Sequence, residues 1–226
     1  MKRFWSEVAI ERGAILLDGR PVKTPARAPL LLPTAALADA IATEWRNVVE
    51  RVDPRTMPMT GLANAAIDHV APDPSAFAAT MSAYSETDLL CYRAEAPTDL
   101  VERQAQAWDP LLDWARRRYD VAFSVTSGIV HVAQPPATVT RLTTAVAAHD
   151  AFALVALSQL VTIAGSLVIA LALAEDVLTP AEGFAAAHLD ELWQADHWGE
   201  EWSSAEARAA RLADFEAAAR FLKLAS

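Results

Sequence analysis

Residues 85–119 read SETDLLCYRAEAPTDLVERQAQAWDPLLDWARRRY, and we arrange the rest of the chain around this stretch. Its first third holds a short apolar run between polar flanks, which predicts a short packed element. From Pro97 onward, apolar residues recur at helical spacing, which predicts a helix with one face in the core. Pro110 removes a backbone donor inside that helix, so we expect a kink or a restart near Asp109, which could serve as N-cap.

The composition bounds the class of protein. The chain has 226 residues, 53% of them hydrophobic, which allows one large domain or two modest ones with a packed core. Its net charge of −10 argues against nucleic acid as a partner, because phosphate binding needs a basic surface. Cys91 is the single cysteine, which excludes internal disulfides and cysteine-based metal clusters and fits a reducing compartment. The sequence has no Gly-rich phosphate loop and no catalytic motif, so we expect no cofactor.

Alternating apolar residues near the N-terminus predict a small sheet. Its strands are expected at residues 4–11, 14–17 and 20–23. A turn is expected at Arg12-Gly13, and Asp18-Gly19 is a strong hairpin signal, since both of its positions tolerate positive φ. Thr34 is a good N-cap for the helix that would cover this sheet.

A second hairpin is predicted at residues 121–132. It is too small to be stable alone, so we expect it to pair with the N-terminal sheet. The fold class is then α+β, a small N-terminal β-rich domain with a covering helix followed by an all-α, orthogonal-type helical bundle. The β-rich domain would comprise residues 1–58 plus 119–134, and the helical domain residues 59–118 plus 135–226.

Two capping boxes mark helix starts in the predicted bundle. They are TPAE at residues 179–182 and SSAE at residues 203–206, each with a hydroxyl cap and a glutamate three positions later.

Residues 151–174 contain no charged side chain and are long enough to cross a bilayer. However, both flanks are acidic, and no Lys or Arg lies near either end, whereas spanning helices usually have basic anchors. We therefore predict two consecutive buried helices broken near Gly165-Ser166, and no stable membrane insertion.

One acidic and imidazole-rich cluster raises an alternative function. It comprises His188, Glu191, His197, Glu200 and Glu201. Carboxylate and imidazole together suit a zinc or di-iron site, so a metal-dependent enzyme is the alternative to a binding protein. The spacing is not that of a zinc protease, and no second helix supplies matching ligands, so a solvated helix end is the favoured interpretation.

The tryptophans divide into two groups. The first group, Trp45, Trp108 and Trp114, lies on apolar stripes and is expected in the core. The second group, Trp193, Trp198 and Trp202, is packed into a short acidic segment where burial of all three is difficult. Exposed aromatic residues are common anchors of protein interfaces, so we predict a partner-binding surface here.

Several stretches resemble a known family. They are KRFWSEV (2–8), DGRPVKTPARAPLLLP (18–33), SETDLLCYRAE (85–95), WDPLLDWA (108–115) and LDELWQADHWGEEW (189–202). Their order is similar to that of the chaperones that assemble the catalytic head of F-type ATP synthase. The resemblance implies an ATP-independent, non-enzymatic chaperone that holds the unassembled α subunit until the β subunit displaces it. It also implies that the acidic region near the end of the chain matters, and the predicted partner-binding residues are Glu191, Trp193, Trp198, Glu200, Glu201 and Trp202.

The N-terminal residues suggest a location. Residues 1–13 lack the Arg- and Ser-rich extension of a mitochondrial transit peptide, so we expect a bacterial cytoplasmic protein, with the mitochondrial matrix as the place of eukaryotic relatives. We expect a monomer.

Overall fold

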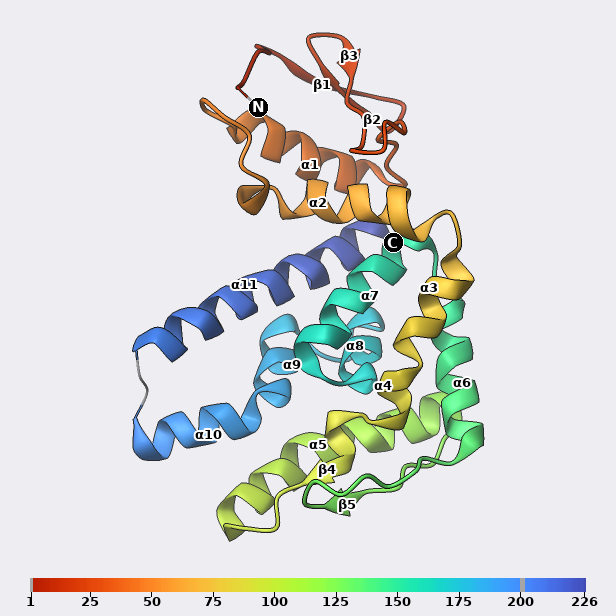
Figure 1. The fold of residues 1–226 in the computed structure, drawn as a ribbon, viewed down its shortest axis with the longest axis vertical. Coiled ribbons are helices and arrows are strands. Elements are labelled where there is room, and N and C mark those ends of the chain that lie inside the picture. The colour runs from red at the N-terminus through yellow and green to blue at the C-terminus, as the bar shows by residue number, and fades with distance from the viewer. Residues whose placement is uncertain (1, 200–201) are drawn as a thin grey trace. The chain divides into compact units, whose positions relative to one another are not determined.

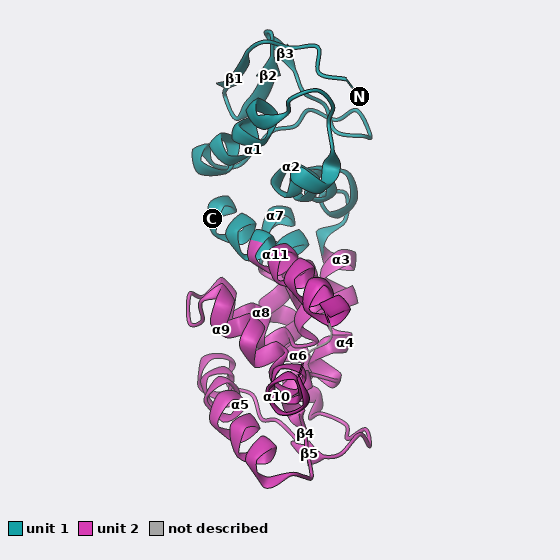
Figure 2. Ribbon diagram, turned by 90° about the vertical axis from the view of Figure 1, so that its left-hand side faces the viewer, with its two compact units in different colours: residues 1–74, 149–156, 217–226 teal, residues 75–148, 157–216 magenta. Residues whose placement is uncertain are grey.

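The computed structural model describes residues 2–199 and 202–226, shown in Figure 1. The chain divides into two compact units, coloured separately in Figure 2. Unit 1 is made of residues 1–74, 149–156 and 217–226, and unit 2 of residues 75–148 and 157–216. The division falls within the helices Ala151–Ala164 (α7) and Trp202–Ala225 (α11), which contribute residues to both units. An antiparallel sheet followed by a mainly helical chain confirms the α+β class.

Unit 1 begins with a three-stranded antiparallel sheet in the order β1-β2-β3. The strands are Val8–Glu11 (β1), Ala14–Leu17 (β2) and Arg20–Pro21 (β3). Both predicted turns are confirmed, with positive φ at Arg12, Gly13, Asp18 and Gly19. The Asp18 carboxylate also accepts backbone N–H bonds from Ser6 and Glu7, which lower its pKa. The sheet thus has the register that its turn residues predict.

Two helices accompany this sheet in unit 1. Helix α1 (Ala35–Asn47) contacts β1 and β2, and Thr34 caps it as predicted by accepting a hydrogen bond from the Leu37 N–H at 3.1 Å. The chain continues through η1 (Pro54–Thr56), α2 (Pro58–Ala65) and a π-helical turn, η2 (Ala66–Val70). The Glu44 carboxylate of α1 accepts the Met59 and Thr60 N–H groups at 2.7 and 2.8 Å, so it caps α2 and fastens the two helices together.

Unit 2 is mainly helical. Its chain begins with α3 (Pro74–Met81), α4 (Ala83–Glu86), η3 (Leu89–Cys91), β4 (Tyr92–Arg93), α5 (Thr98–Tyr119), β5 (Thr126–Ser127) and α6 (Pro136–Ala147). After α7 follow α8 (Leu167–Ala174), α9 (Pro180–Ala187), α10 (Leu189–Trp198) and α11. Helix α8 contacts α4, α5 and α9, and its residues 167–173 are all buried. This helix is the centre of the unit.

The break between α7 and α8 lies where the sequence predicts it. Gly165 has φ of +64°, and Ser166 caps α8 by accepting the Ile169 N–H. The buried carboxylate of Asp88 also accepts the Val168 N–H at 3.0 Å, while its other oxygen accepts the Leu90 N–H. Asp88 therefore joins residues 85–119 to the start of α8. Within residues 2–199 and 202–226, no helix is long and apolar enough to cross a membrane.

Three sequence predictions are wrong in unit 2. Helix α5 runs unbroken through Pro110, so the restart near Asp109 does not occur, and Asp109 forms an ion pair with Arg93 instead of capping a new helix; the alternative of a kink stays a prediction. Residues 121–132 form no hairpin and do not join the N-terminal sheet; instead, β5 pairs in parallel with β4. Ser203 does not begin a capping box, because α11 already starts at Trp202. The box at residues 179–182, in contrast, is confirmed.

The hairpin fails because side chains bond the backbone of its first expected strand. Gln134 is buried, and its side-chain amide bonds both the N–H and the C=O of Ser124 at 2.9 Å. The buried Thr138 hydroxyl does the same for Ala122. Side chains thus bond the backbone groups that a second strand would have used.

The domain boundaries expected from the sequence stay a prediction, which limited proteolysis can test.

Candidate protein-binding surface

Helix α10 carries three of the six residues predicted to bind a partner, Glu191, Trp193 and Trp198, and its acidic side chains fasten it to α5. Asp196 pairs with Arg103 at 3.2 Å, and Asp190 accepts the side-chain amide of the buried Gln104 at 2.8 Å. Trp193 donates its indole N–H to Asp99 at 2.8 Å. These acids are therefore structural partners of α5 as well as surface charges.

Trp193 is buried and supports the aromatic residues near it. The His197 ring stacks on its indole at 4.1 Å, and the Trp198 ring meets it edge-on at 5.4 Å. Trp198 is nevertheless 74% exposed. The Trp198 ring thus faces the solvent while it packs against the buried Trp193. Trp193 itself is not part of the exposed surface.

Trp202 is the second exposed aromatic residue of this segment, at 79% exposure. It opens α11, and Trp198 closes α10. Glu200 and Glu201, which were also predicted to bind a partner, lie outside the described residues. Two exposed indoles therefore flank the predicted acidic pair in sequence.

Glu191 joins α10 to α11. Both of its carboxylate oxygens lie 2.7 Å from the Arg211 guanidinium, and Arg208 lies 3.7 Å away. A hollow of about 410 Å³ opens beside this ion pair, with Gln194 and Trp198 in its wall. The predicted role of Glu191 in binding stays a prediction, but its observed contacts are internal to unit 2.

The histidines of this segment are engaged with neighbouring groups. His188 stacks on Phe184 at 3.9 Å, and its Nδ1 lies 3.1 Å from the Phe184 carbonyl oxygen. Burial lowers the pKa of His188 and so favours the neutral ring. His197 similarly places Nδ1 2.9 Å from the Trp193 carbonyl oxygen. Among the residues that the structure describes, no group of three or more His, Cys, Asp or Glu side chains could hold a metal ion.

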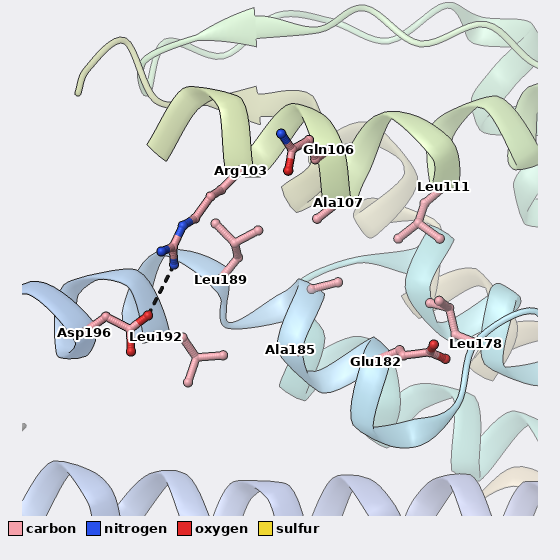
Figure 3. Close-up of a pocket in the computed structure, with 11 residues that line it drawn as sticks. Arg103, Gln106, Ala107, Leu111, Leu178, Glu182, Ala185, Leu189, Leu192 and Asp196 are labelled. Atoms are coloured by element: carbon pink, nitrogen blue, oxygen red, sulfur yellow. Dashed lines mark hydrogen bonds and ion pairs between the residues drawn. The ribbon is translucent and has the colours of Figure 1, made fainter. Parts of the chain in front are cut away.

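Sequence reasoning missed a groove on the other side of α10, shown in Figure 3. Its volume is about 580 Å³, and α5 lies across it from α9 and α10. Apolar side chains line most of it: Ala107, Leu111, Leu178, Ala185, Leu189 and Leu192. The Arg103–Asp196 ion pair lies at one end and Glu182 toward the other. The signal in the sequence was the spacing of Leu189, Leu192 and Asp196, which places them on one helix face.

Similarity to known proteins now connects this surface to a family. A model of the family described as "ATP12 chaperone protein" matches residues 2–116. The solved structure of Atp12 from Paracoccus denitrificans is 44% identical, with a TM-score of 0.94, covering 100% of this chain and 98% of that one. A point mutant of the same Paracoccus protein gives 43% identity with the same TM-score and coverage. A protein from Agrobacterium tumefaciens is 42% identical, with a TM-score of 0.92, covering 98% of this chain and 85% of that one.

The family model covers just over half of the chain, and the structural matches extend the similarity through α10 and α11. The assembly-chaperone resemblance of the sequence is therefore confirmed, and this chain belongs to the ATP12 chaperone family.

Proposed function

We propose that this chain is an ATP-independent holdase that binds the unassembled α subunit of the ATP synthase catalytic head and prevents its aggregation until the β subunit displaces it. Chaperones of this family act in assembly of that head, and they are not enzymes. The observation that carries the proposal is the pair of exposed indoles, Trp198 and Trp202, beside a helix that is pinned to its neighbours. Membership in a chaperone family leaves the metal-dependent enzyme without support.

The physical case rests on what such a surface can bind. Large contiguous apolar patches are uncommon on proteins that have no partner, and Trp is enriched among interface residues of high binding energy. The edge-on contact with Trp193 holds Trp198 in place, so little conformational freedom is lost on binding. Glu200 and Glu201 would supply a charged rim that orients a basic client surface.

The proposal includes a location and an oligomeric state. We place the protein in a bacterial cytoplasm, a reducing compartment that fits its single cysteine. The net charge of −10 opposes self-association, so we propose a monomer.

The direct test uses isolated α subunit, whose aggregation is followed by light scattering. The holdase should suppress aggregation at a near-equimolar ratio, with and without ATP, since the sequence lacks a phosphate-binding loop. An unrelated aggregating enzyme is the control for specificity. An ATP requirement, or equal protection of the unrelated enzyme, would contradict the proposal.

The surface itself is tested by replacing both exposed indoles with Ala. We expect the Trp198→Ala, Trp202→Ala variant to lose protection of the α subunit by about tenfold or more, as for interface anchors. The matched control is Phe4→Ala, which removes an exposed aromatic ring from unit 1. If the control loses as much protection as the double variant, these indoles are not the binding surface.

The acidic pair gives a second test of the same surface. If Glu200 and Glu201 form the proposed charged rim, replacing both by Lys should leave the melting temperature unchanged, because rim charges contribute little to stability. The reversed charge should slow association with the α subunit and weaken protection. Unchanged protection with unchanged melting would remove both glutamates from the functional surface.

A further inference from the structure

The segment that replaces the expected hairpin is exposed and apolar. Residues 129–133, here called the open segment, are all exposed, with Ile129 at 98% and Val130 at 72%. No Asp, Glu, Lys or Arg occurs anywhere in residues 121–140. The segment is therefore rich in β-branched residues, which are enriched in strands, yet these residues are exposed to solvent.

The backbone of the open segment is unpaired. Among the described residues, none of its N–H or C=O groups takes part in a backbone or side-chain hydrogen bond. The segment is nevertheless held on both sides. The Gly128 N–H bonds the Arg93 carbonyl oxygen at 2.8 Å, the Gln134 amide bonds Ser124, and the Tyr92 hydroxyl lies 3.1 Å from Nδ1 of His131. Donors and acceptors without partners thus lie between two held ends, in a segment that has no regular secondary structure.

Native proteins usually protect such an edge with charged residues, proline or a bulge. The open segment has none of these among residues 129–133. A β-branched, uncharged edge with free backbone groups is the chemistry that binds another extended chain by strand addition. A partner surface that presents only side chains would leave the N–H and C=O groups of the open segment unpaired.

We propose that the open segment binds an extended strand of the client through backbone pairing, with Ile129 and Val130 covered by the client's apolar side chains. The inference rests on the proposed function for the identity of the client. A second copy of this chain is the poorer occupant, because two chains of net charge −10 repel each other. The exposed Glu95 side chain, which lies beside Gly128, favours a basic residue next to the incoming strand.

The test compares two kinds of change in the full chain. Ile129→Lys with Val130→Lys places charge on the edge and should weaken protection of isolated α subunit by about tenfold. Val130→Pro with Val132→Pro keeps the edge apolar but deletes two backbone donors, and it should weaken protection to a similar degree. The matched control is Val177→Lys, which charges an exposed valine between α8 and α9. Unchanged melting curves show that each variant is folded.

Amide hydrogen exchange gives a direct readout. Amides within the open segment should exchange at least about tenfold more slowly in the complex than in the free chain, if their N–H groups become paired. No slowing, or full protection by the proline variant, overturns strand addition. Self-association of the wild type that the Lys variant abolishes makes a second copy the occupant and overturns the choice of partner. If the wild type does not protect the α subunit at all, the proposed function is wrong, and the choice of client falls with it. If the wild type protects and the proline variant protects fully, strand addition alone is wrong.

Discussion

Two long stretches of this chain lack Asp, Glu, Lys and Arg, and they lie in opposite environments. Residues 151–174 form α7 and α8, and α8 is buried along residues 167–173. Residues 121–140 include the open segment, which is exposed to solvent. The difference follows from where the backbone N–H and C=O groups of each stretch find their hydrogen-bond partners.

A helix pairs its own backbone groups internally, so it can be buried on every side. Helix α8 needs outside partners only at its ends, where Ser166 and Asp88 accept N–H groups. The stretch before α6 does not pair with itself. Its strand β5 pairs with β4, and the side chains of Gln134 and Thr138 bond the backbone of Ser124 and Ala122. The backbone groups of the open segment are left to the solvent. Lack of charge therefore permits burial but does not bring it about.

The largest effect should come from removing the same side chain in both regions. Ile169 in α8 is 0% exposed, whereas Ile129 is almost fully exposed. Ile169→Ala should lower the free energy of unfolding by about 2–5 kcal/mol, through lost burial and a residual cavity. Ile129→Ala should change it by less than about 0.5 kcal/mol. Denaturant unfolding measures both, and comparable losses would contradict the contrast.

A second test concerns the carboxylate at the start of α8. Burial raises the pKa of Asp88 to about 6, despite the N–H groups that it accepts. A raised folded-state pKa means that the folded chain binds the proton more tightly than the unfolded chain does. The resulting stabilisation is fully present below the ordinary pKa of 3.8 and is lost as the pH rises through about 6.

Asp88→Asn isolates this contribution, because all other titrating groups are shared with the wild type. Between pH 7.5 and pH 5, the wild type should gain about 1 kcal/mol in unfolding free energy relative to Asp88→Asn. Urea titrations at the two pH values measure the difference. A gain in the opposite direction would show that the hydrogen bonds to Val168 and Leu90 outweigh burial.

Much of unit 1 could be predicted because its signals are local. Thr34, Asp18 and Gly19 act through backbone groups within a few residues of themselves, so their roles follow from type and spacing. The break at Gly165 is of the same kind. The family, which the resemblance supplied, was also predictable.

Several features of unit 2 escaped prediction because they depend on contacts between residues that are not neighbours in the sequence. Nothing near Asp190 in the sequence shows that Gln104 will bind it, and nothing near Ser124 shows that Gln134 will replace a strand. The groove beside α10 escaped for the same reason, since its walls come from helices far apart in the chain. Periodicity predicted which face of each helix is apolar, but not which face remains uncovered.

The smallest expected effect concerns the side chain that keeps the loop open. Gln134→Leu preserves much of the volume but removes both hydrogen bonds to Ser124, so we expect a loss of about 1 kcal/mol in unfolding free energy. Gln106→Leu, at an exposed position on α5, is the matched control and should be close to neutral. Amide exchange should become faster at residues 122–134, because the freed backbone opens to water. Slower exchange at residues 129–132 would mean that the expected hairpin forms once Gln134 is removed. The buried amide would then be preventing the hairpin, and the free backbone of the open segment would depend on that single side chain.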